Sequence, residues 1–553
     1  MKLTKQPDLS LDDKSTKIEK TVFMILLAAM AVYYGYRLFA FTPWYDELYT
    51  YYCFISKGPI YAAIHWPLPN NHVGYSVLSA CLDYLGNAYI GLRGVSYLCA
   101  LANICILHRI AGKYMKGWMP LSTVILYISM NLVNQLAVQG RGYTMGITCF
   151  LTAWLCMICI CEENKIAKKI YFIYAIALIL GLYAVSSNVY WVVPLCLAGG
   201  VYLLVGGIRE SREEKCFFLK TKKGKNLLKL IAASVIAAVG TIILYGTVWI
   251  AIGSNLLMKD EKSAYFGMGH IKIILSAPFA AVRRGMEYML DTPYIQSEER
   301  AGFAGRLWDW LKTLSGYFYN SLYVAVMVIW GIGILFLGYK IINSIRKKEK
   351  ANLLLYLVLF MGIVMVPVFL LIQCKRPYYR VFTYGGVFLA VLLGVLLDSV
   401  LKGISAKAAD ERIVKGISVS ALILIVIFGV KCIVFSGYNE QYGIREHEIQ
   451  DAFSHTDMDR WDNFCVTDCN QEYLFYFLYG IRCENREIEG ADVVLLDKRM
   501  TDPDFDEMIW EFYHYYDTIP WTYIEQNMIP VFENDDYILF TRKDKLKERK
   551  NEK

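Results

Sequence analysis

The sequence predicts an all-α polytopic membrane domain of about eleven transmembrane helices, followed by a small extracytoplasmic α/β domain. The 553-residue chain is 56% hydrophobic and 19% charged, whereas soluble proteins carry about a quarter charged residues. Its apolar residues form long runs, close to the ~20 residues that cross the ~30 Å hydrocarbon core of a bilayer. After position 436 the composition becomes polar and acidic.

The long apolar runs are expected to be helices, because a backbone in lipid has to satisfy its own hydrogen bonds. The lysine-rich segment 1–20 carries no signal-peptide cleavage site and is predicted to be a cytoplasmic tail. The transmembrane domain is then predicted over 21–436. Its spans are expected at 21–40, 88–107, 119–138, 142–161, 168–186, 188–208, 227–252, 315–339, 351–373, 380–400 and 415–436.

Charge indicates the orientation, since Lys and Arg collect in short cytoplasmic loops. Basic loops occur at 108–116, 165–169, 209–229, 340–350 and 402–415. Placing all five inside requires an odd number of crossings, so the C-terminus is predicted outside. The segment 438–540 agrees, because it holds 24 Asp and Glu against 6 Lys and Arg in a chain whose net charge is +7. A multi-pass plasma-membrane protein is therefore expected.

Two outside segments, 41–87 and 254–314, are too long to be simple turns. Loops of this length in compact proteins are usually functional or disordered. Their Trp and Tyr residues favour ordered helices at the bilayer surface. Within the second segment, an amphipathic stretch at 271–290 carries Arg283 and Arg284, a pattern typical of helices that lie in the interface plane.

The segment 437–541 is predicted to be the α/β domain, with strands at 463–466, 492–496 and 537–540 and helices at 472–479 and 505–516. The basic tail 542–553 is expected to be disordered. Cys465, Cys469 and Cys483 lie in this outside region. One disulfide among them and a zinc site are both open alternatives.

Two adjacent carboxylates, Asp46 and Glu47, follow the first predicted span directly. A carboxylate at the membrane surface can take a proton from an attacking hydroxyl, which is general-base chemistry. The alternative is a structural role, because Asp and Glu favour the first turn of a helix. Further along, His72 and Tyr75 follow a segment rich in Pro and Asn. His72 is a candidate for contact with a phosphate or an acceptor, and the alternative is a structural histidine.

Cations on the predicted outer side run against the charge rule. Arg141 lies in a short outer turn beside Tyr143, and three cations, Lys375, Arg376 and Arg380, lie within six residues of each other. Guanidinium groups suit phosphate because they offer a rigid set of donors. The alternative is that these side chains reach to lipid headgroups.

Together these motifs resemble the GT-C class of membrane glycosyltransferases, in particular the protein O-mannosyltransferase and aminoarabinose transferase family. The family's His-Pro-Pro-Leu-Tyr segment reads His-Val-Gly-Tyr at 72–75, and its Glu-Ala-Arg-x-Tyr segment reads Gln-Gly-Arg-Gly-Tyr at 139–143. The resemblance implies a polyprenyl-phosphate sugar as donor, an extracytoplasmic active site, and a catalytic role for Asp46 with Glu47 beside it. The two departures concern acceptor recognition.

The resulting hypothesis is a glycosyltransferase that moves a monosaccharide, with inversion, to a protein, lipid or glycan acceptor. Asp46 is the expected general base and Glu47 its orienting partner. The residues expected to bind the donor phosphate and lipid are Arg141, Tyr143, Lys375, Arg376, Tyr378, Tyr379 and Arg380. The residues expected in acceptor or secondary roles are His72, Tyr75, Arg283 and Arg284. No metal is required by this scheme, although a divalent metal is not excluded, and membrane lipids but no nucleic acid are expected as partners.

Two other classes compete with this hypothesis. A transporter or flippase of a lipid-linked saccharide would also place cations and carboxylates at membrane depth. A non-catalytic membrane subunit of cell-envelope polysaccharide assembly is the second alternative. Transfer of labelled sugar to an acceptor would distinguish an enzyme from both.

Overall fold

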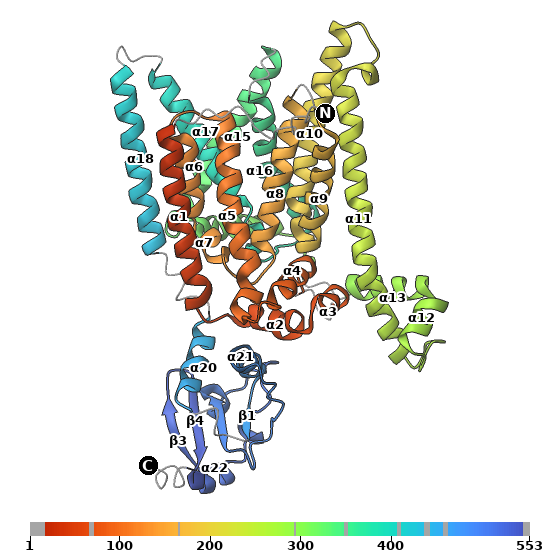
Figure 1. Cartoon of the computed structure of the whole chain (residues 1–553), viewed down its shortest axis with the longest axis vertical. Helices are drawn as coiled ribbons and strands as arrows, with labels where there is room; N and C mark the ends of the chain where they lie inside the picture. The colour runs from red at the N-terminus through yellow and green to blue at the C-terminus, as the bar shows by residue number, and fades with distance from the viewer. Residues whose placement is uncertain are drawn as a thin grey trace, which may run out of the picture.

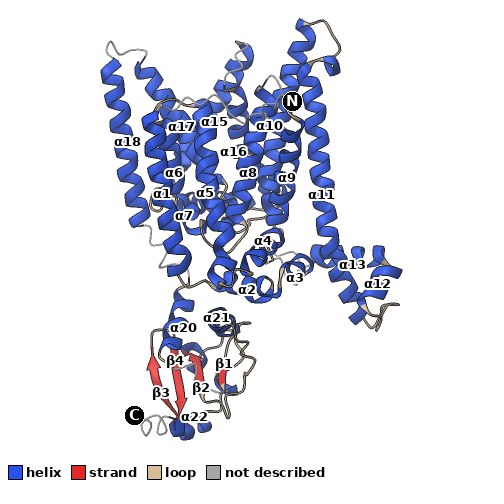
Figure 2. Ribbon diagram, viewed as in Figure 1, coloured by secondary structure: helices blue, strands red, loops and turns tan. Residues whose placement is uncertain are grey.

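The protein folds into a tall helical bundle with a small mixed α/β domain at one end, as the computed structural model shows (Figures 1 and 2). The structure describes residues 17–65, 71–163, 166–291, 295–347, 352–405, 411–435, 443–456 and 463–545. Most of the expected N-terminal tail and of the basic tail after 542 therefore lies outside the described residues.

Nine helices of the described residues are long and apolar enough to cross a membrane, which makes the chain a multi-pass membrane protein. Each coincides with one of the predicted spans. The nine are α1 (Lys17–Ala40), α5 (Ala88–Tyr114), α8 (Tyr143–Glu162), α10 (Val189–Glu213), α11 (Lys222–Lys259), α15 (Tyr323–Arg346), α16 (Leu353–Gln373), α17 (Gly385–Ser405) and α18 (Glu411–Val434).

The other two predicted spans differ from the nine. At 168–186 the structure has a 17-residue helix, α9 (Lys168–Ala184). The prediction of one continuous helix over 119–138 is wrong. α6 (Met119–Ile128) ends at Ile128, and a separate six-residue helix, α7 (Asn131–Leu136), follows it. Met130 between them has an extended backbone. The high average hydropathy of this stretch concealed three amide side chains in α7, which belong to a polar environment.

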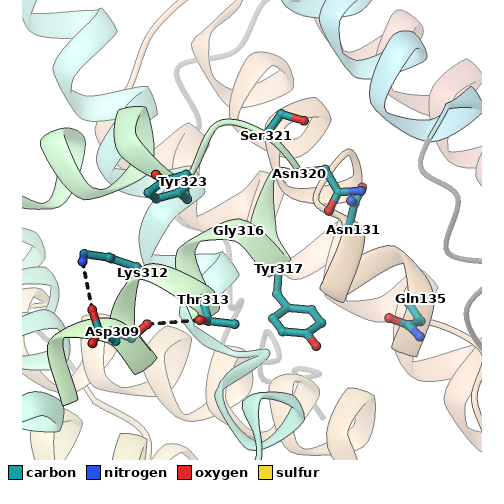
Figure 3. Close-up of a pocket in the computed structure, with 10 residues that line it drawn as sticks. All are labelled: Asn131, Gln135, Asp309, Lys312, Thr313, Gly316, Tyr317, Asn320, Ser321 and Tyr323. Carbon is teal, nitrogen blue, oxygen red and sulfur yellow. Dashed lines mark hydrogen bonds and ion pairs between the residues drawn. The ribbon is translucent and has the colours of Figure 1, made fainter. Parts of the chain in front are cut away.

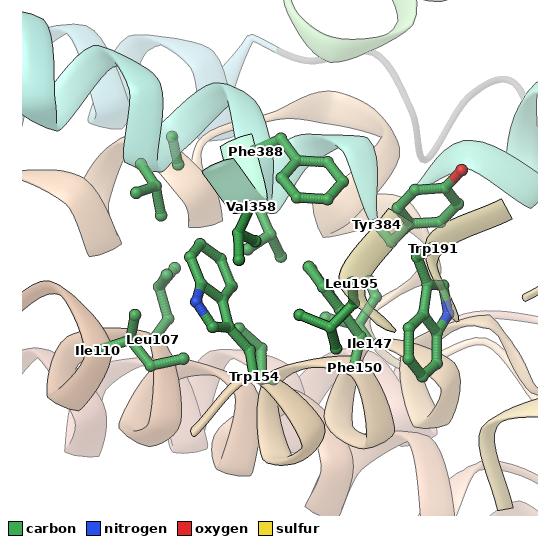
Figure 4. Packing of buried hydrophobic residues seen from close by; sticks show 14 of the residues in the cluster. Leu107, Ile110, Ile147, Phe150, Trp154, Trp191, Leu195, Val358, Tyr384 and Phe388 are labelled. Carbon is green, nitrogen blue, oxygen red and sulfur yellow. The ribbon is translucent and has the colours of Figure 1, made fainter. Parts of the chain in front are cut away.

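The core of the bundle includes α8, whose apolar stretch is 89% buried, and Figure 4 shows the packing of its Phe150 and Trp154 against Trp191 and Phe388. Phe150 stacks on Trp154 with ring centroids 5.6 Å apart, and its edge meets Phe388 of α17 at 5.1 Å. Trp191 of α10 closes the same cluster at 5.3 Å from Phe150. The outer helices instead leave large apolar side chains exposed, for example Leu335 on α15 at 77%, as faces in contact with lipid require.

Both long segments, 41–87 and 254–314, contain helices. Those within 45–83 lie at the end of the bundle nearest the C-terminal domain, and those within 270–291 project to the side at about the same level (Figure 1). The predicted amphipathic stretch is divided in two, because the backbone of Ala277 leaves the helical region. The helices of the two segments are α2 (Tyr45–Cys53), α3 (Pro59–Ile64), α4 (Val73–Asp83), α12 (His270–Ser276), α13 (Pro278–Asp291) and α14 (Phe303–Phe318). Short 3₁₀ helices are η1 (Ile55–Lys57), η2 (Ser186–Asn188), η3 (Phe218–Lys220) and η4 (Tyr379–Phe382).

The C-terminal domain has a four-stranded sheet in the order β1-β2-β4-β3. β1 and β2 are parallel, and the other two pairings are antiparallel. β2 is buried along its whole length, as its continuous apolar run predicts. The elements are α20 (Ile444–Ser454), β1 (Phe464–Val466), α21 (Cys469–Tyr479), β2 (Val493–Asp497), η6 (Lys498–Thr501), η7 (Tyr516–Thr518), α22 (Trp521–Asn527), β3 (Met528–Glu533) and β4 (Tyr537–Arg542).

The three predicted strands and the helix at 472–479 are confirmed, but the predicted helix at 505–516 is wrong. That segment instead forms hydrogen bonds with the end of β1, from Tyr513 N to Thr467 O at 2.9 Å and from Cys469 N to Glu511 O at 3.1 Å. These bonds occupy the backbone groups that a helix would need. β3 was missed because Pro530 lies at a bulge in an edge strand.

Candidate functional site

Glu47 joins three segments of the chain near the end of the bundle that faces the C-terminal domain. Both of its carboxylate oxygens accept from the Arg93 guanidinium of α5 at 2.8 Å, and Oε1 also accepts from Gly140 N at 2.6 Å. Its Oε2 accepts from Trp44 N at 3.3 Å, at the start of α2. With only 1% of its surface exposed, Glu47 is fully engaged in holding α2 against α5 and the 137–142 turn.

Asp46, the neighbouring carboxylate, faces a different partner. Its Oδ2 lies 3.0 Å from Nη2 of Arg380, which enters the site from η4. The Arg380 guanidinium also lies over the rings of Trp44 and Tyr378, at 5.3 and 4.8 Å from their centroids. The structure thus brings together an acid from the first outside segment and a cation from the tenth predicted span.

Arg141 and His72 lie on the other side of Asp46. Arg141 Nη1 donates to Thr50 Oγ1 at 2.6 Å and to the Asp46 carbonyl at 3.3 Å, and its Nη2 lies 3.4 Å from His72 Nε2. Gly142 N donates to His72 Nδ1 at 2.9 Å, so the hydrogen of a neutral His72 sits on Nε2. Burial first, then Arg141 and Arg380, lower the pKa of His72 well below its usual value.

Gly142 is required by this close approach. A Cβ at this position would lie 2.8 Å from the Ala184 carbonyl oxygen and 3.2 Å from His72 Cβ. Contacts this short force a shift of the backbone, which would move Arg141 and Tyr143 on either side. The Tyr143 ring meets His72 edge-on, with centroids 4.8 Å apart.

Three of the four cations predicted to bind the donor, Arg141, Lys375 and Arg380, converge on one cavity of about 370 Å³, which we call the cationic cavity. It is formed where the turns at 71–72, 141–143, 184–190 and 375–381 meet. Its lining residues are Asn71, His72, Arg141, Tyr143, Ala184, Val185, Ser186, Ser187, Val189, Tyr190, Tyr245, Ile295, Lys375, Pro377, Tyr378, Arg380 and Val381. Three positively charged side chains, one from the turn at 141–143 and two from the turn at 375–381, therefore share one space.

Two predicted members of the 375–380 cluster point elsewhere. Arg376 Nε pairs with Glu298 Oε1 at 2.5 Å, and Arg306 holds the other oxygen of that carboxylate at 2.7 Å. Tyr379 stacks between Trp310 and Tyr317 of α14, with centroids 5.4 and 4.8 Å away. Neither residue lines the cationic cavity.

Three further predicted residues lie away from the cavity. Tyr75 is fully buried and donates to the Leu92 carbonyl at 2.6 Å, so it packs α4 against α5. Arg283 and Arg284 lie on α13, where they pair with Glu287 on the same helix, and Arg284 also pairs with Asp260. The contacts of these three side chains are structural.

Sequence reasoning missed Arg93 and the turn at 184–190. Arg93 is five residues into an apolar span and is 4% exposed. A buried arginine in a spanning helix usually pairs with an anionic group. That signal was present in the sequence. Nothing marked Ser186, Ser187 and Tyr190 as lining residues, because they reach the cavity only through the packing of α9 and α10.

The C-terminal domain packs directly against the segment that carries Asp46. Tyr45 N donates to Glu446 Oε1 at 2.9 Å, and the Tyr52 hydroxyl donates to Glu472 Oε1 at 2.6 Å. Leu48 and Tyr51 of α2 belong to the same apolar cluster as the core of the sheet. The start of α2 is therefore held from the membrane side by Glu47 and from the opposite side by this domain.

Two buried carboxyls in the C-terminal domain have raised pKa values. Burial raises the pKa of Asp468 to about 7 and that of Asp497 to about 7, with the nearby Arg445 opposing both shifts. The folded state therefore holds protons that the unfolded chain releases near pH 4. As a result, the stability of this domain falls as pH rises from about 4 through 7.

We expect the amides of α21, which Asp468 caps through Gln471 N at 2.7 Å, to exchange more readily at pH 8 than at pH 6. One carboxyl with a pKa near 7 predicts about a tenfold larger opening constant over that interval. Hydrogen exchange corrected for intrinsic rates measures it. Asp468→Asn keeps a capping oxygen and should remove most of this dependence, whereas Asp517→Asn at an exposed position should not. Equal protection of the native chain at both pH values would contradict the assignment.

Cys465, Cys469 and Cys483 are free thiols in the structure, so the disulfide alternative is not realised there. Cys483 Sγ lies 3.1 Å from the Phe464 carbonyl oxygen and packs within the sheet domain. Within the described ranges no group of three or more His, Cys, Asp or Glu side chains could hold a metal ion.

Comparison with known proteins identifies the fold class. No family model and no curated protein matches the chain. Among solved structures, ArnT from Cupriavidus metallidurans, bound to undecaprenyl phosphate, is similar with a TM-score of 0.51 and 11% identity, over 94% of this chain and 98% of that one. The fold is thus that of the GT-C glycosyltransferases, and the resemblance predicted from the sequence is confirmed at the level of the fold.

The oligosaccharyltransferase AglB from Archaeoglobus fulgidus, in complex with an inhibitory peptide and a dolichol-phosphate, is more distantly similar. Its TM-score is 0.45 at 12% identity, and the match covers 85% of this chain but 64% of AglB. The present chain thus corresponds to less than two thirds of that protein.

Proposed function

We propose that this chain is a membrane glycosyltransferase that transfers a monosaccharide from a polyprenyl-phosphate donor to an extracytoplasmic acceptor. The observation that carries the proposal is the cationic cavity, where Arg141, Lys375 and Arg380 share one space and Asp46 lies 3.0 Å from Arg380. The donor is a phosphodiester anion and the leaving polyprenyl phosphate is a monoester anion, and guanidinium groups bind such anions through several donors at once. Neutral His72 adds its Nε2–H beside Arg141.

An apolar cavity next to the cationic one suits the lipid part of such a donor. It measures about 240 Å³ and lies between α14, α15, α16 and α17, with Trp310, Pro367 and Phe388 in its lining. Phe382 of η4 also lines it, two residues after Arg380. One short turn therefore contributes to both a phosphate-sized basic space and an isoprenoid-like apolar space, which supports a lipid-linked donor over a soluble one.

In the proposed reaction the acceptor oxygen attacks the anomeric carbon of the donor. A new carbon–oxygen bond forms there, the bond from that carbon to the phosphate oxygen breaks, and its electron pair stays with the leaving phosphate. The acceptor proton passes to Asp46 as general base. Displacement in one step inverts the anomeric centre. The positive groups of the cavity stabilise the charge that develops on the phosphate, so the scheme requires no metal.

The pairing of Arg380 with Asp46 couples donor binding to the base. A phosphate that binds Arg380 competes with the Asp46 carboxylate for the same guanidinium, so the bound donor leaves Asp46 available to the acceptor hydroxyl. Glu47, whose oxygens all have partners, then serves to position α2 and the adjacent Asp46.

The test compares neighbouring cations of one loop in the full-length protein, reconstituted in lipid nanodiscs. We expect Lys375→Gln to weaken binding of undecaprenyl phosphate by about 10- to 100-fold, the effect of losing a hydrogen bond to a charged group. Arg376→Gln is the matched control, because Arg376 pairs with Glu298 outside the cavity, and it should leave the affinity unchanged.

The same preparations, given a radiolabelled polyprenyl-phosphate sugar and an extract of cell-envelope acceptors, should transfer label. If the Lys375→Gln protein binds undecaprenyl phosphate with native affinity, the proposed donor-binding role of the 375–380 cations is wrong, and contact with lipid headgroups becomes the preferred interpretation. Facilitated crossing of the labelled lipid with no transfer would instead support a flippase.

A further inference from the structure

A third cavity, of about 730 Å³, lies between α7, α14 and the turn into α15 (Figure 3); we call it the amide cavity. Asn131 and Gln135 of α7 form its inner wall, and since they are four residues apart they lie on one helical face. Both are buried, at 9% and 4% exposed. The remaining lining residues are Asp309, Lys312, Thr313, Gly316, Tyr317, Asn320, Ser321 and Tyr323.

Gln135 contributes a buried amide side chain to the wall of this cavity. Its Nε2 lies within that wall and has no hydrogen-bond partner among the described residues. A buried donor left without a partner costs about 1–3 kcal/mol. A rotation of the amide that brings this donor to a ligand in the cavity would remove that cost.

The cavity differs in charge from the cationic one. Its described lining holds one acid and one base, Asp309 and Lys312, whose side chains pair with each other at 2.9 Å. The other polar groups are amides and hydroxyls, which can both donate and accept, and two tyrosine rings add flat apolar faces. Amides, hydroxyls and aromatic rings match the hydroxyls and C–H faces of a neutral saccharide, and a phosphate would find no unpaired cation there.

The two cavities are separated by a single turn. Tyr378 and Arg380 line the cationic cavity, while Tyr379 between them turns the opposite way and stacks on Tyr317 at 4.8 Å. Tyr317 in turn lines the amide cavity. A ligand that contacts Tyr317 in the amide cavity is therefore separated from the Tyr378–Arg380 turn by the stacked rings of Tyr317 and Tyr379. Arg380 of that turn pairs with Asp46.

We propose that the amide cavity binds the acceptor, and that the acceptor presents a neutral saccharide to it. This inference rests on the transferase function proposed above and adds a substrate class to it. The division of the site follows from charge, with the anionic donor on one side of the Tyr378–Tyr379–Arg380 turn and the uncharged acceptor on the other.

The experiment measures binding of neutral saccharides to the full-length protein in nanodiscs by saturation-transfer NMR. The probes are maltotetraose, cellotetraose and chitotetraose. We expect at least one to bind, and Gln135→Leu to weaken it about 3- to 10-fold, as for a lost neutral hydrogen bond. Asn131→Leu on the same face should act in the same direction. Gln526→Leu, the same change on an exposed position of α22, is the matched control.

Absence of binding by all three probes, or binding that is unchanged in both the Gln135 and the Asn131 variants, would overturn the assignment. Thermal unfolding of each variant shows whether it is folded. Lys312→Ala changes a partly exposed lining residue and leaves the buried wall intact, and it should also weaken saccharide binding. Undecaprenyl phosphate affinity, measured in parallel, should not change with Gln135→Leu. Saccharide binding that depends on Gln135 supports the cavity assignment even if no polyprenyl phosphate binds, a result that would remove the proposed function alone.

Discussion

Replacing Asp46 by Asn is expected to slow sugar transfer by about 10²- to 10⁴-fold, the usual contribution of a general base. The same change should tighten binding of undecaprenyl phosphate, because Asp46 lies 3.0 Å from Arg380 and competes with the donor for that guanidinium. Opposite effects on binding and on transfer are specific to a base that pairs with a donor-binding cation. Single-turnover transfer and equilibrium binding in nanodiscs measure the two quantities separately.

Asp260→Asn is the matched control for this change. Asp260 is an acid near the end of α11 that pairs with Arg284, away from the cavity, and it should alter neither quantity. Transfer at the native rate by the Asp46→Asn protein would exclude Asp46 as the base. Weaker donor binding by that protein would instead mean that Asp46 positions Arg380 and does not compete with the donor.

Replacing Arg93 by Met is expected to lower the free energy of unfolding by about 3–5 kcal/mol, because Glu47 is then left buried without its cation. Arg93 forms two hydrogen bonds of 2.8 Å to Glu47, and both side chains are almost wholly buried. The large effect comes from the uncompensated charge and not from the pair itself. Thermal or denaturant unfolding in nanodiscs measures it.

The double change Glu47→Met with Arg93→Met separates structure from chemistry. Removing both charges should restore much of the lost stability, since replacing a buried ion pair by apolar side chains is often neutral. Because Glu47 positions α2 through Gly140 N and Trp44 N as well as Arg93, transfer should recover less than stability does. Full recovery of transfer would show that these contacts are not needed to place Asp46. An Arg93→Met protein as stable as the native chain would contradict the role described for the pair.

Much of the fold follows from local composition, and most of the site does not. Nine predicted spans and three strands coincide with helices and strands of the structure because apolar length and alternation are properties of short segments. The continuous span at 119–138 failed because an average over twenty residues hides the amides of α7. Asn131 and Gln135 of α7 line the amide cavity. The wrong prediction of a continuous span therefore falls where a polar segment enters the bundle.

The candidate site shows the same limit. Sequence alone placed Lys375, Arg376 and Arg380 in one group, and charge could not tell which of them would enter the cavity. The outcome depends on Glu298, which is 78 residues from Arg376 and pairs with it. In the same way, the partners of Asp46 and Glu47 come from distant segments, Arg380 for one and Arg93 for the other, and sequence alone could not supply them.

The hydrogen bond from Tyr45 to Glu446 joins groups 401 residues apart, and this distance has a consequence for biosynthesis. The segment with the proposed base enters the membrane early, while the domain that holds it from the other side is translated last. A ribosome-bound chain therefore lacks one of the two supports for α2 until nearly every residue has been added. For the proposed reaction, the position of the base would therefore depend on a domain that emerges after the whole helical bundle.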